Sequence, residues 1–99
     1  MGIYLTKDFI KALEKKGFKR DKSHHNMFWF YFSGKKTSIR TRTSHNEKEF
    51  DESMLNERKK QMKLLDRKQF IDFYKCPLDG EVYAKFLIDN EYIKINYIN

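Results

Sequence analysis

The chain has 99 residues and a mass of 12.1 kDa, which suits one domain, because a second core would leave each half too small to bury itself. Its single cysteine excludes the secreted domains that depend on disulfides, and no apolar run approaches the roughly 18 residues of a membrane span. The N-terminus has no secretory signal pattern either, so we expect a cytoplasmic protein without membrane contact and one domain over residues 1–99.

Positive charge is concentrated in the first half of the chain. The 21 lysines and arginines exceed the 14 aspartates and glutamates, which gives a net charge of +7 and a pI near 9.5. Residues 1–45 carry 11 basic and 3 acidic side chains, residues 46–75 carry 8 and 7, and residues 76–99 carry 2 and 4. Such asymmetry suits a polyanion, either a nucleic acid or an acidic protein partner.

The first predicted element is a helix from Lys7 to Lys16. Phe9 and Leu13 recur at helical spacing behind Thr6, whose hydroxyl is a predicted N-cap. Gly17 supplies the left-handed residue that ends a helix.

Three strands are predicted next. A short strand over residues 18–21 is followed by an aromatic strand over 27–32, a turn over 33–36 and a strand over 37–43. The last two strands form an antiparallel hairpin. Alternation along the final strand predicts two different faces. One is compatible with a core and carries Thr37, Ile39, Thr41 and Thr43, and the opposite face is cationic and carries Arg40 and Arg42.

The second half of the chain is predicted to be mainly helical. A loop over residues 46–49 leads to a helix that Asp51 or Ser53 can cap, with an interrupted apolar stripe of Met54, Leu55, Met62 and Leu65. Its outer, solvated side carries Glu57, Arg58, Lys59, Lys60 and Lys63.

A third helix is expected to open at Asp66, with Gln69 completing a capping box, and to stop before Pro77. A further helix after Asp79 and a strand over residues 92–98 follow. Together these elements predict an α+β fold, a small α-β-β-β-α domain with a C-terminal helix and strand extension over residues 76–99.

The three histidines lie at the two ends of the predicted hairpin. Antiparallel pairing brings these ends together, so His24 or His25, Arg42 and His45 are expected to share a polar surface. Cleavage of RNA without a metal needs a base for the 2′-hydroxyl, an acid for the leaving oxygen and cations for the charge that develops on phosphorus. Histidine and arginine are suited to these roles, although a loop histidine on a basic protein is more often only a solvated side chain.

Other types of site are less well supported by the sequence. No histidine, cysteine or carboxylate spacing typical of a metal centre is present, so we expect no metal and no cofactor. Cys76 lies before Pro77 among apolar residues and is expected to be buried and inert. Trp29 and its aromatic neighbours are expected to be mostly core, with one alternate row left exposed where it could stack bases.

Residues 6–73 resemble the HicA toxin family of mRNA interferases. The resemblance rests on the helix that ends in Gly17, the Ser23-His24-His25 segment that leads into an aromatic strand, the hairpin followed by His45, and the basic helical region that ends toward Phe70. It implies a fold like that of double-stranded-RNA-binding domains, with His24 as the catalytic histidine and His45 as the histidine after the third strand. It also implies mRNA as substrate and a HicB-like antitoxin protein as partner.

The leading hypothesis is therefore a metal-independent endoribonuclease that acts as the toxin of a toxin–antitoxin pair, with His24 and His45 as catalytic residues. The residues expected to contact RNA are Lys22, His25, Lys35, Lys36, Arg40, Arg42, Lys59 and Lys60. One alternative is a non-catalytic double-stranded-RNA-binding or adaptor domain, which is favoured by Lys22 in the position of the family's glycine. Another is an interaction module whose basic face meets an acidic protein.

Overall fold

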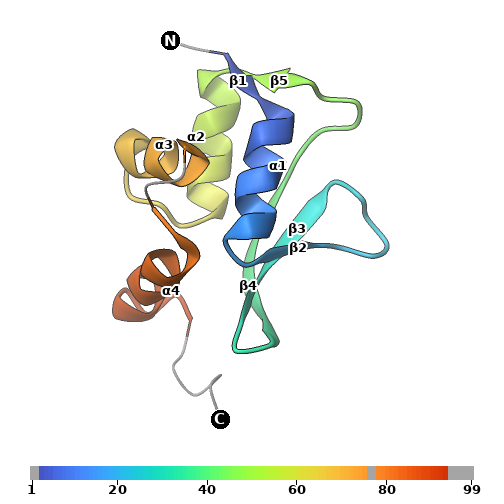
Figure 1. Cartoon of the computed structure of the whole chain (residues 1–99). Helices are drawn as coiled ribbons and strands as arrows, with labels where there is room; N and C mark the ends of the chain where they lie inside the picture. Colours follow the sequence, from blue (N-terminus) through green and yellow to red (C-terminus); the bar gives the residue numbers. More distant parts are fainter. Residues whose placement is uncertain (1–2, 76–77, 94–99) are drawn as a thin grey trace.

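A three-stranded antiparallel sheet forms one side of the fold (Figure 1). It consists of β2 (Phe18–Arg20), β3 (Met27–Phe32) and β4 (Lys35–Arg42), with β3 in the middle. The computed structural model describes residues 3–75 and 78–93.

Four helices lie to one side of this sheet in the described part of the chain. They are α1 (Thr6–Lys15), α2 (Glu52–Gln61), α3 (Arg67–Lys75) and α4 (Gly80–Asp89). Since α1 precedes the three strands and α2 follows them, the predicted α-β-β-β-α order of a small α+β domain is confirmed. Within residues 3–75 and 78–93, no helix has the length and apolar character needed to cross a membrane.

The β3–β4 hairpin forms as predicted. Ser33 and Gly34 alone make its turn, with φ of 52° and 79°, and a two-residue turn with positive φ matches the twist of paired strands. The second strand therefore begins at Lys35, two residues earlier than predicted. At the other end of the hairpin, Met27 lies opposite Arg42.

The two faces of the sheet have different chemistry, as predicted from the alternation. One face is buried and carries Phe28, Phe30, Thr37, Ile39 and Thr41. The opposite face, called here the outer face, carries Lys19, Met27, Trp29, Tyr31, Lys36, Arg40 and Arg42, whose cationic side chains are all exposed. The helices supply the rest of the core on the buried side, including Phe9 and Leu13 of α1 and Leu55 of α2.

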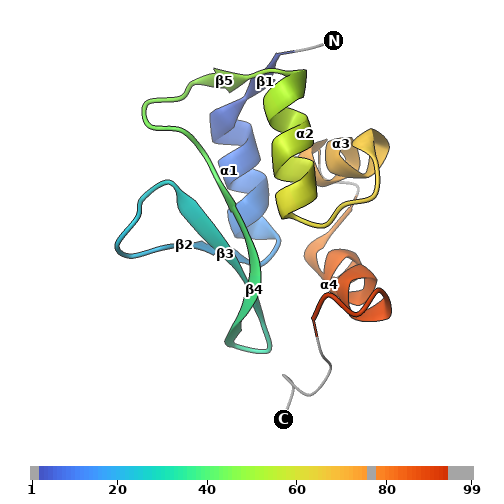
Figure 2. The same ribbon diagram turned by 180° about the vertical axis from the view of Figure 1, so that it is seen from behind.

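A second, two-stranded sheet was not predicted. β1 (Tyr4–Leu5) pairs with β5 (Glu49–Phe50), so the predicted loop over residues 46–49 is wrong at its last residue. The pairing is stabilised by Phe50, which is buried and lies 5.4 Å from the Tyr4 ring, measured between centroids. This ladder crosses the N-terminal ends of α1 and α2 (Figure 2).

The predicted cap of α1 is also wrong. Thr6 is the first helical residue, Leu5 precedes it without a capping side chain, and the Thr6 hydroxyl donates to Glu47 Oε2 at 2.6 Å. The Thr6 hydroxyl therefore bonds to the Glu47 carboxylate, 41 residues away in the chain, and does not cap the backbone of α1. Gly17 has the predicted left-handed backbone, with φ of 110°.

Helix α2 begins as predicted, but two side chains of the longer helix predicted from the sequence do not lie where expected. The Asp51 carboxylate accepts from Met54 N at 3.1 Å and caps the helix. Arg58, expected on the solvated side, is only 1% exposed, because it forms a buried ion pair with Glu47. Leu65, expected in the apolar stripe, is 68% exposed, and Leu64 is buried instead.

The error at Leu65 has a local cause. The helix ends at Gln61, and Lys63 adopts a left-handed φ of 65°, so the helical period does not continue to residue 65. Asp66 accepts from Gln69 N at 2.9 Å and opens α3 as predicted, while the Gln69 side chain accepts from Leu65 N.

The predicted C-terminal helix is α4, and its side chains belong to the main core. Asp79 caps it by accepting from Val82 N at 2.9 Å. Tyr83 is fully buried, with its ring centroid 5.1 Å from that of Phe30 and 5.9 Å from that of Phe18. Tyr92 and Ile93 are not in a strand, and the rest of the predicted strand over 92–98 lies outside the described residues, as does Cys76.

Candidate functional site

The two ends of the hairpin that carry histidines meet in one cavity. Residues 23–27, Arg42 and His45 line it, and it is called here the histidine cavity. Thr43 N donates to Asn26 O at 2.8 Å, which extends the strand pairing one step beyond Met27 and Arg42. The segments before β3 and after β4 are thereby held together, and the cavity of about 540 Å³ falls in the range of roughly 300–1,000 Å³ of small-molecule sites.

Asp21 organises the loop that carries His24 and His25. Its Oδ1 accepts from Ser23 N at 2.7 Å and from His24 N at 3.1 Å, and its Oδ2 accepts from Trp29 Nε1 at 2.9 Å. These bonds, with that from Ser23 the largest contribution, lower the pKa of the Asp21 carboxyl below its usual range. The next histidine is held by its backbone, since Arg20 Nη1 donates to His25 O at 2.6 Å.

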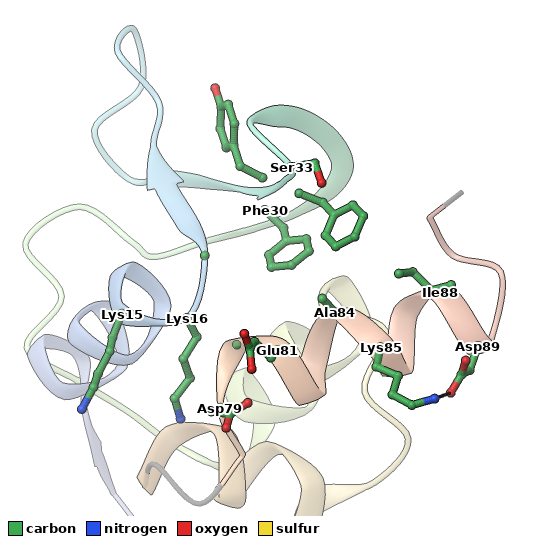
Figure 3. Close-up of a pocket in the computed structure, with 14 residues that line it drawn as sticks. Lys15, Lys16, Phe30, Ser33, Asp79, Glu81, Ala84, Lys85, Ile88 and Asp89 are labelled. Atoms are coloured by element: carbon green, nitrogen blue, oxygen red, sulfur yellow. Dashed lines mark hydrogen bonds and ion pairs between the residues drawn. The ribbon is translucent and has the colours of Figure 1, made fainter. Parts of the chain in front are cut away.

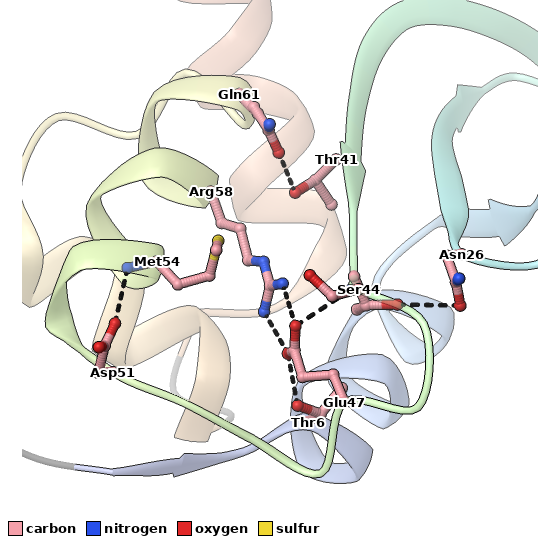
Figure 4. Close-up of polar contacts among 10 residues, drawn as sticks. Thr6, Asn26, Thr41, Ser44, Glu47, Asp51, Met54, Arg58 and Gln61 are labelled. Carbon is pink, nitrogen blue, oxygen red and sulfur yellow. Dashed lines mark hydrogen bonds and ion pairs between the residues drawn. The ribbon is translucent and has the colours of Figure 1, made fainter.

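Glu47 organises the turn that carries His45 (Figure 4). Its Oε1 accepts from Ser44 N at 3.0 Å, and both of its carboxylate oxygens accept from the Arg58 guanidinium, at 2.6 and 2.7 Å. Burial acts to raise the pKa of Glu47, but the bonds from Arg58, Thr6 and Ser44 outweigh it and lower the pKa to about 2. The turn is thereby tied to both α1 and α2.

The histidine and arginine side chains of the histidine cavity are not engaged by the rest of the described protein. His24, His25, Arg42 and His45 are all exposed. In the described ranges, no hydrogen bond or ion pair is formed by these four side chains, and no carboxylate lines the cavity. Three imidazoles and a guanidinium therefore face a space in which they are available to a ligand. Imidazole can transfer protons near neutral pH, and guanidinium binds phosphate.

A second cavity adjoins the first and is called here the Trp29 cavity. It is lined by residues of the hairpin and of the end of α2, among them Met27, Trp29, Arg40, Arg42, Gln61 and Lys63. Met27 and Arg42 line both cavities, so the two lie next to each other. Arg40 thus lies next to the histidine cavity rather than in it.

The remaining residues predicted to contact RNA are more dispersed. Lys22 is exposed on the Asp21 loop, and Lys35 lies beside the hairpin turn, at the opposite end of β4 from Arg42. The backbone of Lys36 is also at the turn end of β4, but its side chain extends to Trp29, with Nζ 4.1 Å from the ring centroid. Lys59 and Lys60 are on α2 and line neither cavity.

Sequence reasoning did not single out Asp21, Glu47, Arg58, Gln61 and Lys63 as residues of the site. For Asp21 a signal was available, because an aspartate two residues before a polar turn often accepts from the following backbone N–H groups. The Glu47–Arg58 pair has no such signal, since the two residues are 11 positions apart on a loop and a helix.

A larger cavity, of about 770 Å³, lies between α4, the end of α1 and the end of β3 (Figure 3). Phe30, Ala84 and Ile88 give it an apolar floor, and charged side chains such as Lys15 and Glu81 lie around it. None of the predicted site residues lines this cavity.

The described residues contain no group of three or more histidine, cysteine, aspartate or glutamate side chains that could hold a metal ion. No protein-family model matches the chain, and no match is found among curated proteins or solved structures.

Proposed function

We propose that the protein is an RNA-binding, metal-independent endoribonuclease whose active site is the histidine cavity. The observation that carries this proposal is the convergence of His24, His25, His45 and Arg42 on one open cavity without protein partners in the described part of the chain. The positive charge of residues 1–45 would attract the polyanionic substrate.

In the proposed reaction, one imidazole takes the proton of the ribose 2′-hydroxyl, and the 2′-oxygen attacks the adjacent phosphorus. A second imidazole donates a proton to the 5′-oxygen that leaves. Arg42 stabilises the additional negative charge on the phosphoryl oxygens. The products are a 2′,3′-cyclic phosphate and a 5′-hydroxyl, and the enzyme regains its starting protonation by proton exchange with water.

We assign the two proton transfers to His24 and His45. His24 lies on the loop before β3, which Asp21 fixes, and His45 lies on the turn after β4, which Glu47 fixes, so the two imidazoles come from the two chain segments that flank the hairpin. His25 and Lys22 are assigned to phosphate contact, together with Arg40, Lys35, Lys36, Lys59 and Lys60.

The wider proposal is that the protein is a toxin similar to the HicA family, with a fold like that of double-stranded-RNA-binding domains, mRNA as substrate and a HicB-like antitoxin as partner. The α1-β2-β3-β4-α2 order and the Ser23-His24 segment entering β3 support it. A non-catalytic RNA-binding domain is the second candidate. It is favoured by the Trp29 cavity, whose basic and aromatic lining would bind RNA without the histidines.

The test is incubation of labelled RNA with the purified protein in EDTA, scoring cleavage and gel retention together. We expect the wild type to cleave, His24→Ala and His45→Ala to retain RNA without cleaving it, and His25→Ala to cleave more weakly. Lys85→Gln is a matched control, because Lys85 is exposed on α4 and lines neither the histidine cavity nor the Trp29 cavity.

Retention without cleavage by the wild type would support the non-catalytic candidate. The absence of both signals at low salt would overturn nucleic-acid binding and favour an acidic protein partner.

A further inference from the structure

The outer face of the sheet holds cations directly above aromatic rings. Lys36 Nζ lies 4.1 Å and Arg40 Cζ 5.2 Å from the centroid of the Trp29 ring, and Lys19 Nζ lies 4.6 Å from that of Tyr31. None of these three cations forms an ion pair with a carboxylate in residues 3–75 and 78–93. The face therefore combines positive charge with π surface, although the Asp21 carboxylate interacts electrostatically with Lys36.

This combination suits an unpaired nucleotide. A base has a π face that stacks on tryptophan, and its phosphate is an anion that lysine and arginine bind. The Lys36 side chain is long and flexible, so it can leave the ring for a phosphate when a base replaces it. Trp29 itself is fixed, because its Nε1 donates to Asp21.

The position of Trp29 relative to the histidine cavity favours one RNA strand that contacts both. Met27 and Arg42 line both cavities, and Trp29 follows Met27 by two residues on the same face of β3. Two residues of a strand span roughly 6.6 Å, which is comparable to the distance between neighbouring nucleotides in an extended chain. A phosphate at Arg42 thus leaves the adjacent base within reach of Trp29.

We infer that the outer face of the β3–β4 hairpin binds the single-stranded RNA segment next to the scissile bond, with one base stacked on Trp29. The inference rests on the proposed function for the location of the scissile bond, and it goes further by naming unpaired RNA as the substrate. Duplex RNA does not fit this role, because its bases are stacked on one another and its base faces are unavailable.

Trp29 is the only tryptophan of the chain, so its fluorescence reports on this surface directly. The probe is a single-stranded 2′-O-methyl RNA, which lacks the attacking hydroxyl and is not consumed. We expect saturable quenching of Trp29, and we expect a duplex of the same sequence to quench little. By gel retention, Trp29→Leu should bind the single strand about tenfold more weakly, with little change for the duplex.

Two further variants control for folding and for charge alone. Trp29→Phe keeps an aromatic surface and should retain most of the affinity that Trp29→Leu loses. Lys36→Gln should weaken binding and lower the salt dependence by about one phosphate contact, whereas Lys85→Gln should not.

Cleavage of RNA without quenching of Trp29, or equal quenching by the duplex or by polyglutamate, would overturn the binding of single-stranded RNA to the outer face. The nuclease proposal would still stand. Quenching by the single strand without cleavage of ordinary RNA would support single-strand binding at Trp29 and overturn the nuclease proposal.

Discussion

The Glu47 carboxylate and the Arg58 guanidinium form a bidentate ion pair that is buried between the turn after β4 and helix α2. The N–O distances are 2.6 and 2.7 Å, and the two side chains are 8% and 1% exposed, respectively. The Arg58 guanidinium also lies over the Phe50 ring, 4.7 Å from its centroid. Because Glu47 also accepts from Ser44 N, this pair supports the turn in which His45 lies.

The ion pair predicts loss of stability in acid. The pKa of Glu47 is about 2 in the folded protein and ordinarily 4.5, so its ionisation stabilises the fold by on the order of 3 kcal/mol above pH 4.5. This contribution should disappear as the pH falls from about 4.5 to about 2. By urea unfolding, the wild type should have a higher free energy of unfolding than Glu47→Gln at pH 7, and this difference should become smaller as the pH falls toward 2.

Glu57→Gln is the matched control for that experiment, since Glu57 is exposed on α2 and has no ion pair in the described structure. Arg58→Ala should destabilise the protein at pH 7 by roughly 3–5 kcal/mol, because it leaves a buried carboxylate without its partner. A wild type whose unfolding free energy is the same at pH 3 as at pH 7 would contradict this role of the pair.

Asp21 is predicted to be a positioning residue for His24. Asp21→Ala removes the acceptor of the Ser23, His24 and Trp29 donors, so kcat for RNA cleavage should fall more than KM rises, and Trp29 emission should shift. Asp21→Asn keeps an acceptor oxygen and should restore part of kcat. If both variants changed only thermal stability, with kcat and emission unaltered, the positioning role would be wrong.

The hairpin end of the site was predictable because its determinants are local. The Ser33–Gly34 turn makes the hairpin antiparallel, and antiparallel pairing brings the segments of His24 and His45 together. The exact register at that end was not predictable, because an irregularity between Trp29 and Tyr31 shifts it by two residues. The support beneath the site was not predictable. Arg58 lies four residues from both Met54 and Met62, so the helical period places it on the predicted apolar stripe, but its charge favours a solvated position. What the sequence does not show is the partner that allows its burial, because Glu47 lies in a segment without periodicity.

Gly17 is predicted to be essential for joining α1 to the sheet. Its φ is 110°, and a Cβ at this position would lie 2.7 Å from Phe30 Cε1 in the core. Gly17→Ala should therefore lower the free energy of unfolding by roughly 2–3 kcal/mol, through backbone strain and overpacking. Gly34→Ala separates the two effects, since φ is 79° there but nothing lies within 4 Å of the added Cβ. If thermal unfolding showed that Gly17→Ala and Gly34→Ala lose equal stability, the contact with Phe30 would be unimportant.

Arg42 is predicted to act in the chemical step, and Lys60 only in binding. Arg42 lines the histidine cavity, whereas Lys60 lies on α2 outside it. Arg42→Gln should reduce the single-turnover cleavage rate at saturating RNA about 100-fold, as expected for loss of a transition-state charge contact. Lys60→Gln should leave that rate unchanged and weaken retention at low salt, with the loss of affinity shrinking as the salt concentration rises. A normal saturated rate in Arg42→Gln would remove it from the proposed mechanism.

The most direct test of the proposed function is the chemistry of the product ends. RNA would be incubated with the wild type, His24→Ala and His45→Ala in EDTA, and the termini would be identified by mass spectrometry. The account predicts 2′,3′-cyclic phosphate and 5′-hydroxyl ends from the wild type, none from either variant, and no cleavage of RNA with 2′-deoxy sugars. Products with 3′-hydroxyl and 5′-phosphate ends, or equal cleavage by His24→Ala and the wild type, would contradict it.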